Sequence, residues 1–157
     1  MPRHSWTYCW VVCCLLMMWS ALAAAASELT ITHGTETRVL TLDEIEAVGV
    51  TRLEMRHPEG FEGQFTGVWL DDFLEAQGMA QARRVRFIAH DGYTTFLTPE
   101  QRRQKAYLLV TRIDGEPIAL EDFGPYMLVV PEDVEEVLEG TETMTRWIWA
   151  IAEVCVR

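Results

Sequence analysis

Cysteine is nearly absent from the part of the chain that can fold as a domain. Of the four cysteines, Cys9, Cys13 and Cys14 fall in one apolar segment near the start of the sequence, which leaves Cys155 alone further on. A single cysteine cannot form an internal disulfide, and no Cys-x-x-Cys pair follows that segment. A disulfide-stapled scaffold is therefore excluded for residues 27–157.

Positive charge is scarce as well. The chain has 13 Lys and Arg residues against 24 Asp and Glu residues, and its formal net charge is −11. Nucleic acid and anionic membrane surfaces would repel such a chain, so we expect neither as a partner. The balance instead suits a partner protein that carries a basic patch.

Standard catalytic and metal-binding motifs are missing from the sequence. It has no Gly-x-Ser-x-Gly elbow, no His-Glu-x-x-His and no Walker loop. His33, His57 and His90 are widely separated, which is not a spacing typical of zinc ligands. We therefore expect no metal site and predict no catalytic residue.

The first 26 residues have the pattern of a secretory signal peptide. Arg3 precedes an apolar run over residues 8–22, and the small residues Ala23–Ala26 follow it. A membrane anchor is the alternative, but the run is short for a span of about 20 residues and lacks a basic flank. We expect cleavage near Ala24–Ala26 and export of residues 27–157, as one domain, to the periplasm.

Apolar periodicity and turn residues predict a mixed β-sheet with short helices, an α+β fold. The helices are expected at 42–48, 71–76, 98–105 and 131–139, with caps at Thr41 and Thr98. A Gly-rich loop is expected at 59–63, and a turn over 65–70 leads into the second helix. The strands are expected at 27–41 as a hairpin, then at 50–58, 83–91, 94–97, 107–113, 126–130 and 144–156.

The expected last strand carries two tryptophans and the remaining cysteine. Alternation along 144–156 predicts that Trp147 and Trp149 share a face with Ile151. These tryptophans line either a ligand pocket or the core, and the core is the commoner place. Cys155 is expected to be a buried structural thiol rather than a metal ligand.

Three stretches of sequence resemble one known family. They are the strand, turn and strand of 105–131 (KAYLLVTRIDGEPIALEDFGPYMLVVP), the Phe-x-Gly-Val-x-Leu of residues 65–70, and the basic-Trp-Ile pattern at Arg146. Together they resemble the molybdopterin-binding domain of sulfite-oxidase-type oxidoreductases, and small secreted single-domain members in particular. The resemblance covers nearly all of residues 27–157 and implies a pterin-type ligand.

The sequence departs from the catalytic members of that family at one position. Those enzymes bind molybdenum through a cysteine about a dozen residues before the Gly-Val, and here that place is occupied by Met55 to His57. Neither a thioether nor an imidazole simply replaces a thiolate ligand.

Three functions stay open. The resemblance to small secreted members favours a non-catalytic pterin-binding protein that signals to a membrane-bound partner controlling cyclic-di-GMP. The alternatives are a molybdopterin-dependent periplasmic oxidoreductase, or a subunit of one, and a structural protein without a small ligand.

Loop positions in the resembled fold indicate the residues expected to contact a pterin. They are Arg56, His57, Phe61, Asp91, Tyr93, Phe123 and Tyr126. Asp91 could instead simply cap an Asp-Gly turn. Arg102, Arg103 and Lys105 form a basic group that either binds a phosphate or acidic partner or is merely solvated.

Overall fold

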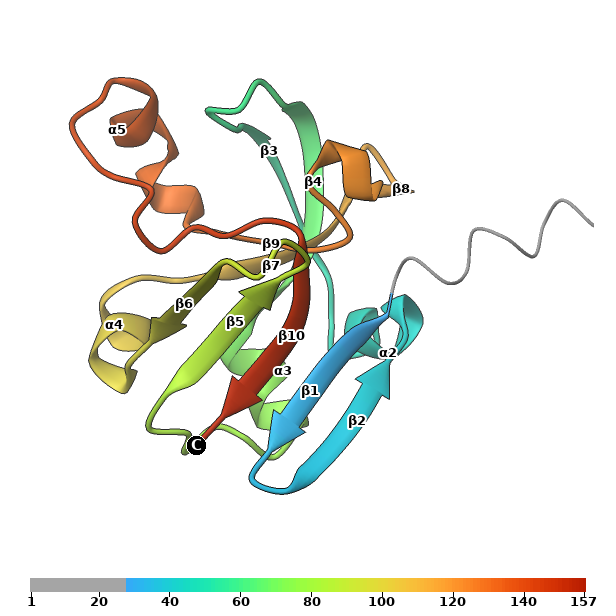
Figure 1. The fold of residues 1–157 in the computed structure, drawn as a ribbon. Coiled ribbons are helices and arrows are strands. Elements are labelled where there is room, and N and C mark those ends of the chain that lie inside the picture. Colours follow the sequence, from blue (N-terminus) through green and yellow to red (C-terminus); the bar gives the residue numbers. More distant parts are fainter. Residues whose placement is uncertain (1–27) are drawn as a thin grey trace, which may run out of the picture.

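Two β-sheets form the frame of the structure, a computed structural model that describes residues 28–157. The predicted signal peptide at 1–26 lies outside the described residues. The first sheet has the strand order β2-β1-β10-β5-β6 (Figure 1). Its members are β1 (Leu29–His33), β2 (Glu36–Leu40), β5 (Val85–Ala89), β6 (Thr94–Leu97) and β10 (Ile151–Val156).

The first and last strands of the described chain are neighbours in that sheet. β1 pairs with β10 in parallel, whereas the other strand pairs of the sheet are antiparallel. The sheet is therefore mixed, as predicted. Along β5 the apolar residues Val85, Phe87 and Ala89 are buried and the residues between them are more exposed, which confirms the expected alternation.

The second sheet is antiparallel and centres on β7. Its members are β3 (Thr51–Arg56), β4 (Glu62–Trp69), β7 (Leu108–Ile113), β8 (Glu116–Pro117) and β9 (Met127–Val129). β7 pairs with β4, β8 and β9. Consecutive residues of a strand point to opposite faces, and Leu108 to Thr111 are all buried, so both faces of β7 are covered along this stretch.

Short helices connect and cover the strands. They are α2 (Leu42–Glu46), α3 (Leu70–Ala76), α4 (Pro99–Gln104) and α5 (Val134–Leu138), with the 3-10 turns η2 (Leu120–Asp122) and η3 (Pro131–Asp133). Thr41 and Thr98 each form a capping box at the start of a helix, as the sequence predicted. α3 lies behind the first sheet in Figure 1 and buries Leu70, Phe73 and Leu74.

Residues 65–70 do not form the predicted turn into a helix. Residues 65–69 belong to β4, which also takes up the end of the predicted loop at 59–63, and α3 begins directly after it at Leu70, one residue before the predicted start. The glycine at 67 explains the departure from a simple turn. A Cβ there would collide with backbone atoms of Leu109 and Val110, so Gly67 marks a close approach of β4 to β7 at a register shift.

The predicted long strand 144–156 is also wrong in its first half. Only Ile151–Val156 forms β10, and Ala150 before it has a positive φ of 54°. Residues 144–150 instead cross β9, with one bridge between Ile148 and Leu128. A register shift after Ile151 then places Ile151 and Val154 both in the core, so the expected alternation of faces fails as well.

Candidate aromatic binding site

The end of β3 places one histidine in the protein interior. Thr51, Leu53 and Met55 alternate with exposed residues along β3, and His57 continues this inward face. Only 3% of His57 is exposed. The following turn is closed by backbone hydrogen bonds from His57 N–H to the Phe61 carbonyl (2.7 Å) and from Gly60 N–H to the His57 carbonyl (2.9 Å).

Five rings from three distant segments pack around this turn. We call them the aromatic cluster: His57, Phe61, Phe123, Trp147 and Trp149. The His57 ring centroid lies 5.8 Å from that of Phe61, 5.4 Å from Trp147 and 6.0 Å from Trp149. Phe123 completes the group, 5.4 Å from Phe61 and 5.6 Å from Trp149. Most of these contacts are edge-to-face, the arrangement that aromatic quadrupoles favour.

Two polar atoms of the aromatic cluster are buried without a hydrogen-bond partner among residues 28–157. They are Nε2 of His57 and Nε1 of Trp147. Trp147 as a whole is 4% exposed. An unsatisfied buried N–H costs roughly 1–3 kcal/mol, so such atoms are rare in native structures and mark places where a ligand or water completes the site.

The protonation of His57 follows from its surroundings. Burial lowers the pKa of His57 from 6.5 to about 4, because the charged imidazolium would be poorly solvated there. The Glu59 backbone N–H donates to Nδ1 at 3.2 Å. Nδ1 is thus the acceptor of a neutral ring, and the proton resides on Nε2.

A cleft opens beside the two tryptophans of the cluster. We call it the indole cleft; its volume is about 460 Å³. Its lining comes from the β5–β6 turn and from the segment before β10, namely Ala89, Asp91, Tyr93, Met144, Thr145, Trp147, Ile148 and Trp149. Pockets for small molecules commonly have volumes of about 300–1,000 Å³ and mainly apolar and aromatic walls.

Five of the predicted contact residues thus belong to one region. His57, Phe61 and Phe123 lie in the aromatic cluster, while Asp91 and Tyr93 line the indole cleft. Asp91 also caps its turn, since its Oδ1 accepts a hydrogen bond from the Tyr93 N–H at 2.8 Å. The turn-capping and ligand-contact interpretations of Asp91 are therefore compatible.

The other two predicted contacts, Arg56 and Tyr126, do not line the indole cleft. Arg56 follows the outward face of β3, and its guanidinium pairs with Glu135 of α5 at 3.3 Å. Tyr126 is fully buried. Burial raises the pKa of its hydroxyl, and the nearby charges of Glu46 and Arg112 also act on it.

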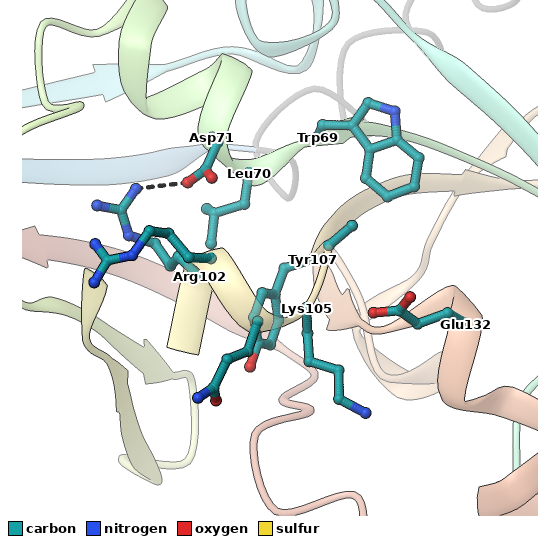
Figure 2. A pocket seen from close by; sticks show the side chains of 10 residues that line it. Trp69, Leu70, Asp71, Arg102, Lys105, Tyr107 and Glu132 are labelled. Atoms are coloured by element: carbon teal, nitrogen blue, oxygen red, sulfur yellow. Dashed lines mark hydrogen bonds and ion pairs between the residues drawn. The ribbon is translucent and has the colours of Figure 1, made fainter. Parts of the chain in front are cut away.

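The basic group on and after α4 is paired with acidic side chains. Arg102 pairs with Asp71, Arg103 with Glu100, and Lys105 with Asp133. Figure 2 shows the Arg102–Asp71 pair beside a hollow of about 270 Å³ whose wall also includes Lys105. Because acids already neutralise these cations, the hollow is a weaker candidate for a phosphate site than the sequence alone indicated.

The donor set at the expected metal position does not fit a thiolate-bound metal. Met55 is half-buried on β3 and His57 presents a protonated nitrogen. Cys155 lies in the other sheet, half-buried rather than fully buried as expected, with its thiol donating to Glu153 at 3.0 Å. Burial raises the pKa of this thiol. Residues 28–157 contain no group of three or more His, Cys, Asp or Glu side chains arranged to hold a metal ion.

The fold and the sequence agree with one protein family. Residues 36–151 match the oxidoreductase molybdopterin binding domain family, and the chain belongs to it. This confirms the resemblance and the α+β fold that it implied. No curated protein matches the chain significantly. Within the described part of the chain, no helix is both long enough and apolar enough to cross a membrane.

Trp147 and Trp149 were predicted to line either a ligand pocket or the core, and neither was among the residues expected to contact a pterin. A regular strand would have placed both on one face, where core burial is the usual outcome. The irregular backbone before β10 instead lets both indoles contact His57 and line the cleft. The density of tryptophan in Arg-Trp-Ile-Trp was the available signal.

Proposed function

We propose that this chain is an exported, non-catalytic pterin-binding protein, which reports pterin availability to the periplasmic domain of a membrane-bound protein that controls cyclic-di-GMP. The family assignment supports a pterin-type ligand. The observation that carries the proposal is the indole cleft, in which two tryptophans face a turn bearing Asp91 and Tyr93.

The chemistry of the cleft suits a flat, polar heterocycle. The indoles and the Tyr93 phenol offer surfaces for stacking on a pterin ring. The carboxylate of Asp91 can accept hydrogen bonds from the amino and ring N–H groups of a pterin. A ligand of this size would sit against the same rings that pack around His57.

The absence of a suitable metal ligand separates this proposal from an oxidoreductase function. The end of β3 offers the Met55 thioether, and His57 after it offers a neutral imidazole with its proton on Nε2, where a thiolate would be needed. A non-catalytic role requires only that the ligand shift the protein between two conformations with different partner-binding faces. The acidic surface of the chain would then meet a basic surface of the partner.

Analysis of the protein purified from its native export compartment tests the proposal. Acid-released, oxidised pterins are measured by fluorescence, and molybdenum is measured in the same sample. Pterin without molybdenum supports the sensor function. Near-stoichiometric molybdenum would overturn it in favour of an oxidoreductase, and a protein with neither would indicate a structural role.

A further inference from the structure

The two unsatisfied nitrogens of the aromatic cluster have the same polarity. The indole Nε1 of Trp147 can only donate a hydrogen bond. His57 Nε2 is also a donor, because the Glu59 N–H occupies the lone pair of Nδ1. The rings that carry them lie 5.4 Å apart between centroids, and both residues are more than nine-tenths buried. The aromatic cluster therefore has two buried donors that find no acceptor among residues 28–157.

We propose that the ligand of the indole cleft supplies this acceptor as a carbonyl oxygen. The inference rests on the proposed function and specifies which edge of the ring is recognised. A 2-amino-4-oxo pterin has donors on one edge and the 4-carbonyl acceptor beside them. The Asp91 carboxylate would accept hydrogen bonds from the donor edge of the pterin. The N–H groups of Trp147 and His57 would donate hydrogen bonds to the 4-carbonyl oxygen.

Access to these donors requires a rearrangement, because His57 is not among the residues that line the indole cleft. Trp147 lines the indole cleft, yet its Nε1 lies beneath the molecular surface. The indole must therefore turn toward the cleft as the carbonyl enters. Because Trp147 also contacts His57, such a turn couples ligand binding to the packing of the β3 end. This coupling provides the two-state element that the proposed signalling function needs.

A pair of isosteric ligands isolates the role of the carbonyl. A 2,4-diaminopteridine has the same bicyclic shape as the 2-amino-4-oxo pterin, but an amino group replaces the 4-oxygen. Two buried donors facing that amino group would be left unpaired, and sites built for a hydrogen bond reject such analogues strongly. We expect the wild-type chain to bind the oxo compound at least about tenfold more tightly.

The experiment measures the affinities of residues 27–157 for both compounds by titration of tryptophan fluorescence, with calorimetry for variants that lose an indole. Trp147→Phe keeps an aromatic ring at this position but removes the N–H donor, so the preference for the oxo compound over the diamino compound should shrink several-fold. Trp149→Phe is the matched control. Trp149 lines the same cleft, but its nitrogen is not among the unsatisfied buried atoms, so the preference should persist.

The possible failures are distinguishable. If neither compound binds to wild-type protein, the proposed function fails. If both bind with equal affinity, pterin binding stands and the acceptor inference is wrong, with water satisfying the two donors. If circular dichroism shows that Trp147→Phe folds poorly, His57→Phe provides the second test, because it removes the other donor. It should reduce the preference for the oxo compound over the diamino compound. An unchanged affinity ratio in His57→Phe would also overturn the inference.

Discussion

His57 and Trp147 pack against each other, with ring centroids 5.4 Å apart and ring planes inclined at 49°. Each ring carries a buried nitrogen without a partner in the described chain. The pair joins the turn after β3 to the segment before β10, so the geometry of the candidate site depends on how these two segments, which are distant in the sequence, pack together. Its consequences for stability and binding can be tested separately.

The first prediction concerns stability and pH. Burial lowers the pKa of folded His57 to about 4, below its usual 6.5. Between these values the unfolded chain binds a proton that the folded chain does not, so stability falls as pH drops from about 6.5 toward 4. His57→Phe removes this dependence. Relative to the variant, wild-type protein should lose roughly 1–2 kcal/mol between pH 7 and pH 5, measured by urea unfolding.

A control variant separates this effect from general acid sensitivity. His90 is exposed at the end of β5, and His90→Gln should keep the wild-type pH dependence. If the free energy of unfolding changed with pH in the same way in wild-type protein and in His57→Phe, the prediction would be wrong, because His57 would then not cause the loss of stability at low pH.

The second prediction concerns the half-buried ion pair between Glu46 of α2 and Arg112 of β7. The Glu46 carboxylate accepts hydrogen bonds from Arg112 Nε at 2.8 Å, Arg112 Nη2 at 3.2 Å and Thr111 Oγ1 at 2.7 Å. This carboxylate raises the pKa of Arg112. Glu46→Ala removes the acceptor of the Arg112 Nε and Nη2 donors, whereas Thr111 Oγ1 keeps the Thr66 carbonyl at 3.2 Å. We expect a loss of roughly 1–3 kcal/mol in the free energy of unfolding.

An exposed ion pair supplies the comparison for Glu46. Arg103 and Glu100 pair across one turn of α4 with both side chains about two-thirds exposed (67% and 66%). Arg103→Ala should therefore cost at most about 1 kcal/mol. Equal losses in the two variants would contradict the assignment of a stabilising role to the Glu46 network.

Most elements of the fold could be predicted from local sequence signals. The capping boxes at Thr41 and Thr98 are encoded within four residues, and the alternation along β5 follows from a regular strand. The path of residues 144–150 could not be found in this way. It depends on the positive φ of Ala150 and on the hydrogen bond from its N–H to the Phe123 carbonyl, a contact with a distant segment.

The candidate site shows the same division between local and distant information. Loop position indicated His57, Phe61 and Phe123, and these three lie in one cluster. Loop position also indicated Arg56, but neighbouring strand residues point to opposite faces, and Arg56 pairs with Glu135 instead. Trp147 joins His57 only through tertiary packing, which no local pattern specifies.

The third prediction concerns Gly67 in β4. A methyl group added there would meet the Leu109 carbonyl oxygen and the Val110 Cα, which are backbone atoms and cannot rotate away. Gly67→Ala should therefore destabilise the domain by about 3 kcal/mol. Gly34→Ala is the reference, because it has a positive φ of 63° but open space around the added atom. A smaller loss at Gly67 than at Gly34 would show that β4 can move away from β7.

The last prediction separates the two roles of Asp91. Its Oδ1 accepts the Tyr93 N–H, so Asp91→Ala removes both the turn cap and the charge. Asp91→Asn retains an amide oxygen that can cap the turn, yet it lacks the carboxylate that would accept hydrogen bonds from a pterin amino group. We expect Asp91→Asn to keep wild-type thermal stability and to bind a 2-amino-4-oxo pterin at least about tenfold more weakly, since hydrogen bonds to a charged acceptor contribute about 1.5–3 kcal/mol. Asp91→Ala should show the same weakening together with a loss of about 1 kcal/mol in stability. Unchanged affinity in both variants would leave Asp91 with the turn-capping role alone and move the donor edge of the ligand elsewhere in the indole cleft.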